Sequence, residues 1–175
     1  MRQTFIRRFM LPKYGAVTAV VAAVIAGAAY VLPAAAQAPP APITAEPLTP
    51  RSVFVDDIGL KFKIKLDGGA TNVVDVKDPS WTVVVRYTVQ PAAQFPWHSH
   101  AGPVVVNIVS GALTYVGADD CVQRTYAAGQ VFVDPGQGHA HTAFNPVNAP
   151  TVFVATFFGA PAEGSLLIAA PPGGC

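Results

Sequence analysis

The most informative stretch of this 175-residue chain is Pro96-Trp97-His98-Ser99-His100-Ala101-Gly102-Pro103, which runs directly into the apolar segment 104–109. The chain has four histidines, and the other two, His139 and His141, form a second pair with the same one-residue spacing. Side chains two positions apart on a strand point to the same face, so each pair can direct two imidazoles at one point. Because imidazole suits Zn, Cu, Fe and Ni, the pattern predicts a metal site. The alternative, histidines that cap turns or line a polar edge, leaves the shared spacing unexplained.

The composition predicts an all-β fold. Val, Ile, Phe, Tyr and Thr are abundant, the chain has 15 Gly and 17 Pro, and no long stretch after residue 36 repeats apolar residues at helical spacing. Lys and apolar residues alternate over residues 61–66, which indicates a strand with one solvent-exposed face and one buried face. Ser110-Gly111 is a hairpin signal. About nine or ten such strands, spaced every eight to twelve residues, favour a closed barrel or a double-sheet jelly roll in one domain.

The N-terminus resembles an export signal. Four basic residues precede an apolar run at 16–32, which ends in small residues suited to cleavage; the basic residues are Arg2, Arg7, Arg8 and Lys13. We therefore expect a signal peptide over residues 1–36, cleaved after Ala36, and an exported protein, periplasmic or extracellular. The alternative is an uncleaved membrane anchor, since about 17 apolar residues are at the short end of a membrane span.

Composition also divides the rest of the chain. Residues 37–50 hold five prolines and almost no charge, which predicts an extended Pro-rich linker without a core of its own. The β-barrel domain is expected over residues 51–161, followed by a C-terminal tail, 162–175.

The charge argues against a nucleic-acid partner. Four of the eleven Lys and Arg residues lie in the leader, so seven remain against ten Asp and Glu, a net charge of −3. A nucleic-acid-binding domain is normally basic. A membrane is expected as partner only through an uncleaved N-terminal segment, and a homodimer is left open.

Two cysteines fit an exported protein. Thiols tend to pair outside the cytosol, so we expect a disulfide between Cys121 and the C-terminal Cys175 that tethers the tail to the domain. Closing this loop would contribute roughly 3 to 4 kcal/mol in the chain-entropy model. Two free thiols, or a thiolate metal ligand, are the alternatives.

Residues 51–161 resemble the cupin superfamily, whose motifs read G-x5-H-x-H-x(3,4)-E-x6-G and G-x5-P-x-G-x2-H-x3-N. His98, His100 and Gly111 match the first motif, but Ala92 stands at its first glycine and Val104 at its glutamate. The second motif is matched, with one extra residue before the histidine, by Gly129, Pro135, His141 and Asn145. The resemblance implies a double-stranded β-helix, or jelly-roll barrel, with a divalent metal held by the motif histidines.

On this resemblance the expected metal ligands are His98, His100 and His141, with Fe, Mn, Zn, Cu or Ni as the ion. Val104 in place of glutamate would leave three neutral imidazoles around a dication, so the site should keep an open position and prefer a small anionic molecule. His139 is expected in the Gly-rich bend as an acid–base group or a residue supporting the ligands; as a strand residue it would be a fourth ligand. Asn107 and Gln137 are further candidates for that position.

Three kinds of function remain open from the sequence. The first is a metal-dependent oxygenase, or a related lyase or isomerase, since three-histidine cupins that act as dioxygenases are known in the superfamily. The second is a non-catalytic cupin that holds a metal or small ligand, and the third is a structural extracytoplasmic β-domain. Whether the protein is an enzyme is not decided by the sequence, because this fold hosts many activities.

Overall fold

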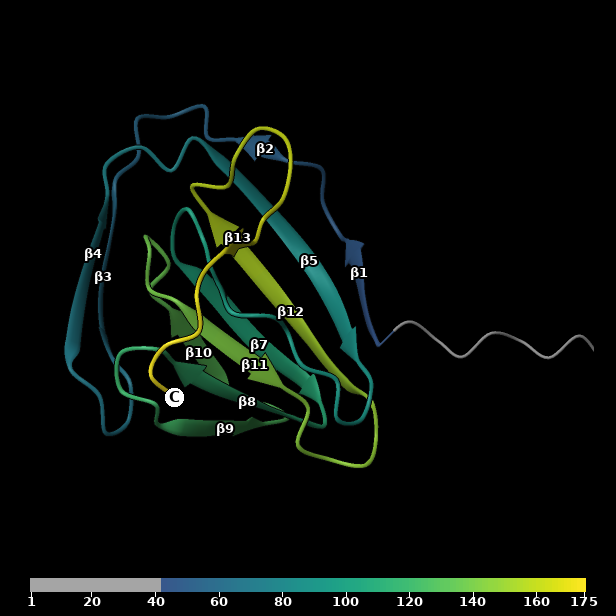
Figure 1. The fold of residues 1–175 in the computed structure, drawn as a ribbon. Helices are drawn as coiled ribbons and strands as arrows, with labels where there is room; N and C mark the ends of the chain where they lie inside the picture. Colours follow the sequence, from purple (N-terminus) through teal and green to yellow (C-terminus); the bar gives the residue numbers. More distant parts are fainter. Residues whose placement is uncertain (1–41) are drawn as a thin grey trace, which may run out of the picture. The chain divides into compact units, whose positions relative to one another are not determined.

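The computed structural model describes residues 42–175, so the expected signal segment and residues 37–41 of the expected linker lie outside it (Figure 1). The described part contains strands and no helix, which confirms the all-β prediction, and consequently no helix in it could span a membrane. The strands are β1 (Ile43–Pro47), β2 (Ser52–Val53), β3 (Leu60–Lys65), β4 (Thr71–Val76), β5 (Trp81–Val89), β6 (His98–Ser99), β7 (Val104–Ser110), β8 (Ala112–Gly117), β9 (Gln123–Ala127), β10 (Val131–Asp134), β11 (His141–Phe144), β12 (Thr151–Phe158) and β13 (Ile168–Ala169).

The strands form two main antiparallel sheets and a separate hairpin. One sheet has the order β1-β5-β12-β7-β10, with β2 also paired to β5, and the other has the order β13-β6-β11-β8-β9. Neighbours in both sheets are mostly far apart in sequence, and the long strands β5, β12 and β7 run side by side in Figure 1. This is the predicted jelly roll.

The core lies between the two main sheets, and strands such as β7 and β12 alternate between buried and more exposed residues. On β7, Val104, Val106 and Ile108 are buried, whereas Val105 and Asn107 between them are only half-buried. The residues on β5 follow the same period, and they join Leu113, Tyr115 and Phe132 of other strands in one apolar cluster. Each such fully buried side chain stabilises the fold by about 1.5–3 kcal/mol. This alternation determines which residues of β5 and β7 face the interior, where the site described below is found.

Strands β3 and β4 form a hairpin with a small core of its own. The lysines of β3 are exposed, as the alternating sequence predicts, and Ile64 packs with Val74, Val76 and the half-buried Val133 of β10. Arg124 on β9 donates from Nε to the carbonyl oxygen of Asp67, 2.6 Å away, in the hairpin turn. The hairpin is therefore fastened to both sheets.

The structure extends the folded domain beyond residues 51–161 at both ends. Residues 43–47, expected to be linker, form β1 and pair with β5 from Ile43–Val89 to Pro47–Val85. A proline is tolerated here because β1 is an edge strand that leaves one side unpaired. In the expected tail, β13 pairs with β6, Ala169 lying opposite His98. The tail thus belongs to the sheet that carries the histidines.

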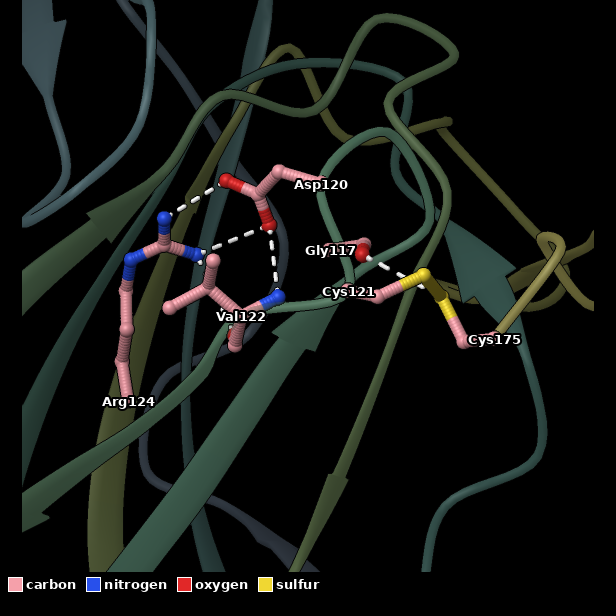
Figure 2. Close-up of a disulfide and its surroundings, with 6 residues drawn as sticks. All are labelled: Gly117, Asp120, Cys121, Val122, Arg124 and Cys175. Carbon is pink, nitrogen blue, oxygen red and sulfur yellow. Dashed lines mark hydrogen bonds and ion pairs between the residues drawn. A yellow bond between two sulfur atoms is a disulfide. The ribbon is translucent and has the colours of Figure 1, made fainter.

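The predicted disulfide joins Cys121 and Cys175 (Figure 2). Their Cα atoms are 5.4 Å apart, and the bridge connects the chain end to the turn after β8. Beside it, the Arg124 guanidinium forms an ion pair with Asp120, at 2.6 Å from Nη2 to Oδ2, and lowers the pKa of that carboxyl. Disulfides of this kind are typical of oxidising compartments.

Candidate metal centre

His98, His100 and His141 converge inside the barrel. His98 on β6 lies directly opposite His141 on β11, so both side chains project from the same face of the sheet, and His100 follows one residue after β6. The ring centroids are 4.2 Å apart for His98 and His141, 4.8 Å for His98 and His100, and 5.2 Å for His100 and His141. One ring nitrogen from each lies within 4.8 Å of those of the other two. The structure thus brings the three predicted ligands together in one cluster.

Hydrogen bonds to carbonyl oxygens fix the tautomer of two of these rings. His98 donates from Nδ1 to the carbonyl oxygen of Pro96 at 2.7 Å, and His100 donates from Nδ1 to that of Leu166 at 2.8 Å. Because a carbonyl oxygen only accepts, each Nδ1 carries the hydrogen, and Nε2 of the neutral ring keeps its lone pair. Metal-binding histidines are held in this way. The C-terminal segment takes part through Leu166.

Burial keeps the three imidazoles neutral. Burial lowers the pKa of His98, although its bond to Pro96 works in the opposite direction. Burial likewise lowers the pKa of His100 to about 4 and that of His141 to about 3. The lone pairs needed for metal binding are therefore available at neutral pH. Each ring is also packed against an aromatic neighbour: Phe95 for His98, Phe157 for His100 and Tyr115 for His141.

A fourth group, Asp134, also faces the cluster and is missing from the sequence prediction. Its side chain is 2% exposed, and Oδ2 lies 3.2 Å from Nδ1 of His141 and 3.5 Å from Nε2 of His100. Oδ1 accepts a hydrogen bond from the backbone N–H of Gly136 at 3.0 Å. Burial raises the pKa of Asp134, because water is excluded from the carboxylate. The sequence held one signal that Asp134 faces the interior: it lies two positions after the apolar Phe132 on β10, which is buried.

The cluster lies in the wall of a cavity of about 40 Å³. Apart from the three histidines and Asp134, the lining is aliphatic and aromatic: Tyr87, Phe95, Val104, Val106, Leu113, Tyr115, Phe132, Ala143, Phe153, Ala155, Phe157 and Leu167. Burial raises the pKa of Tyr87 to about 12 and also raises that of Tyr115, so both phenols stay protonated at neutral pH. The site is a small polar cluster in an apolar interior.

The other candidate residues lie away from this cavity. His139 is in the bend between β10 and β11, as expected, but it lines shallow hollows with Ala118, Asp119 and Ala140 rather than the wall that carries the three histidines. Gln137 in the same bend is exposed. Asn107 is on β7 in the opposite phase to Val104 and Val106, so strand alternation directs it away from the cavity.

The donor set fits a divalent transition metal. Three neutral imidazoles, two of them with Nε2 free, are a common ligand set for such ions. Among residues 42–175, the buried side-chain polar atoms without a hydrogen-bond partner are Asp134 Oδ2 and His141 Nδ1. Buried polar atoms in folded proteins normally have partners. A cation at this point would satisfy both atoms.

Comparison with known proteins gives several similar folds. No curated protein matches this sequence. A polyketide cyclase, RemF from Streptomyces resistomycificus, is 17% identical with a TM-score of 0.44, over 51% of this chain and 61% of the cyclase. An uncharacterised double-stranded β-helix protein from Klebsiella pneumoniae is 21% identical with a TM-score of 0.43, over 71% of this chain and 86% of that protein. The cupin domain of an XRE-family transcriptional regulator from Enterobacter cloacae is 16% identical with a TM-score of 0.45, over 69% of this chain and 99% of that domain.

The sequence also matches a family model, described as a cupin domain, over residues 85–157. The matched segment begins within β5 and ends within β12, and it contains both histidine pairs and Asp134. The match covers the strands that build the cavity, and the described part of the chain has the jelly-roll architecture expected of that family. Residues 85–157 therefore match the cupin domain, which confirms the resemblance seen in the motifs.

Proposed function

We propose that this protein is an exported cupin that holds a divalent transition metal through His98, His100 and His141 and acts, as an oxygenase-type or related enzyme, on a small organic molecule with one anionic group. The observation that carries the proposal is the convergence of three buried imidazoles at an apolar cavity. The bonds from Nδ1 of His98 and His100 to backbone carbonyl groups support it, because they leave Nε2 free to bind an ion.

The cavity supports the size and polarity assigned to the substrate. About 40 Å³ corresponds to on the order of three water molecules, so the bound molecule must be small or must displace part of the wall. Aromatic walls from Tyr87, Phe153 and Phe157 would contact an apolar body and exclude water from it. The anionic group would face the histidines.

The metal would supply the chemistry that the side chains lack, namely a Lewis acid and, if redox-active, the means to use dioxygen. The chain's own residues would hold that ion, orient the bound molecule and keep water out. Tyr115 stacks on the His141 ring at a centroid distance of 4.9 Å and thereby fixes its plane. His139 does not line the cavity, so we assign it no role as a metal ligand.

The disulfide supports export. Cys121–Cys175 is the kind of bond that persists outside a reducing cytosol. The basic and apolar leader of residues 1–36, which lies outside the described residues, has the composition of a signal segment. Export through this leader, with or without cleavage, is part of the proposal.

A non-catalytic metal- or ligand-binding cupin is the second candidate, and one observation favours it. In the described part of the chain, the titratable side chains that line the cavity are the three histidines, Asp134, Tyr87 and Tyr115. Apart from the groups facing the proposed metal, that leaves two phenols with raised pKa values, which are poor bases at neutral pH. Catalysis would therefore depend on the metal itself.

Metal analysis of the protein purified without chelator tests the proposal. We expect about one equivalent of iron, manganese or copper per chain, lost in His141→Ala and retained in His139→Ala, the matched control two residues earlier in the chain. Addition of that metal should raise the melting temperature of the wild-type protein and of His139→Ala only. Zinc as the resident ion would contradict the oxygenase assignment, and equal metal in both variants would contradict the site.

A further inference from the structure

Asp134 is a buried carboxylate without an adequate partner, and this inference rests on the metal site proposed above. It is 2% exposed, and no lysine or arginine pairs with it among residues 42–175. Its Oδ1 is satisfied by the Gly136 N–H, whereas Oδ2 points at the histidines without a hydrogen bond. Burial of a carboxylate is costly unless a cation or several donors meet it. The fold therefore retains a buried carboxylate that a cation at this point would stabilise.

The distances around Oδ2 match those between ligands of one metal. Oδ2 lies 3.2 Å from His141 Nδ1 and 3.5 Å from His100 Nε2, yet it forms no hydrogen bond with either ring. Ligands bonded at 2.0–2.2 Å to one ion lie about 2.8 to 3.6 Å apart in octahedral or tetrahedral arrangements. His100 Nε2 is also the nitrogen that the bond to Leu166 leaves free. We propose that Asp134 is a fourth, anionic ligand of the metal.

The strand pairing gives this ligand a specific origin. Asp134 on β10 lies directly opposite Val104 on β7, and both side chains line the cavity. Val104 is the position at which the family motif has glutamate, so the carboxylate is supplied from the neighbouring strand instead. The site would then carry a net charge of about +1 with a dication, enough to attract a monoanion.

Cobalt(II) titration of four proteins, followed by its visible absorption against a competing chelator, tests the proposal. In Asp134→Asn we expect Co(II) affinity to fall by about 100-fold or more, beyond the ~10–100-fold typical of a residue that only positions a ligand. The absorption bands should also change, because the ligand set changes. The double variant Val104→Glu/Asp134→Val should recover affinity to within about 10-fold of wild type by returning a carboxylate to the same cavity. Asp75→Asn, an exposed carboxylate on β4, is the charge-matched control and should bind as wild type does.

Melting curves show whether a lower Co(II) affinity comes from loss of a ligand or from misfolding of the variant. In chelator, Asp134→Asn should melt no lower than wild type, because an unpaired buried carboxylate is removed. With Co(II) the order should reverse. A loss below about 10-fold with unchanged absorption bands would overturn the ligand proposal and leave Asp134 as a positioning residue, because asparagine can still accept a hydrogen bond from His141. Absence of Co(II) binding by the wild-type protein would instead overturn the metal site itself.

Discussion

Replacing Gly136 with alanine is expected to lower the free energy of unfolding by about 3 kcal/mol or more. Gly136 has φ +61°, where a side chain costs ~1–2 kcal/mol. A Cβ atom at this position would also overlap the carbonyl oxygen of Gly102, which adds an overpacking cost of ~1–3 kcal/mol. The backbone that this overlap would displace is that of Gly102, two residues after His100. The Gly136 N–H also donates the hydrogen bond to Asp134. Metal affinity should therefore fall together with stability.

Gly138→Ala is the matched control for this variant. Gly138 is in the same bend with φ +89°, but a Cβ atom there would meet no atom within 4 Å. Denaturant unfolding in chelator should show a loss of about 1 to 2 kcal/mol for Gly138→Ala, from the backbone conformation alone. Similar losses in the two variants would show that the bend yields to the clash and that its contact with residues 100–103 is not important for the site.

Removal of the disulfide is expected to reduce the free energy of unfolding by roughly 3 to 4 kcal/mol. Cys121 and Cys175 are separated by 54 positions, and opening a loop of this size frees the unfolded chain. The native state is affected as well, because the bridge holds the segment that contains β13, Leu166 and Leu167. The variant Cys121→Ser/Cys175→Ser should therefore also lose metal more readily.

Guanidinium unfolding of the double serine variant, beside wild type with and without reductant, measures this contribution. The reduced wild-type protein and the serine variant should agree, which separates the loss of the bond from the effect of the substitutions. A loss under about 1 kcal/mol would mean that other contacts fix the C-terminal segment, such as those from Arg51 to the carbonyl oxygens of Pro161 and Gly164.

The sequence could predict the parts of the site that repeat a local pattern. His98, His100 and His141 follow the two-residue period of strands, so their common face could be read from spacing, although their convergence on one point depends on β6 pairing with β11. The disulfide was predictable because only two cysteines exist. The exposed lysines of β3 were predictable because they also follow the two-residue period of a strand.

Asp134 could not be assigned to the site from its neighbours in sequence. It ends a short strand before Pro135, where an aspartate is usually a turn residue. Its importance comes from the pairing of β10 with β7, which sets it opposite Val104, and from long-range packing that buries it beside His100 and His141. Spacing along one strand carries no information on which strand lies next to it.

The strands at the two ends of the domain could not be predicted from the sequence for a related reason. Prolines indicated a linker at residues 37–50, and nothing local shows that β5 has a free edge that β1 can pair with. Likewise the segment 162–175 has no strong strand pattern, yet β13 pairs with β6 and the carbonyl group of Leu166 orients His100. In both cases the tertiary partner supplies the hydrogen bonds that make the segment a strand.

X-ray absorption at the metal edge of the loaded protein tests the central claim most directly, because it reports the atoms bound to the ion. The account predicts a first shell of nitrogen and oxygen at about 2.0–2.2 Å, with outer-shell scattering from three imidazoles that falls to two in His141→Ala. A shell with sulfur at about 2.3 Å, or a spectrum without imidazole scattering, would contradict a three-histidine centre in this protein.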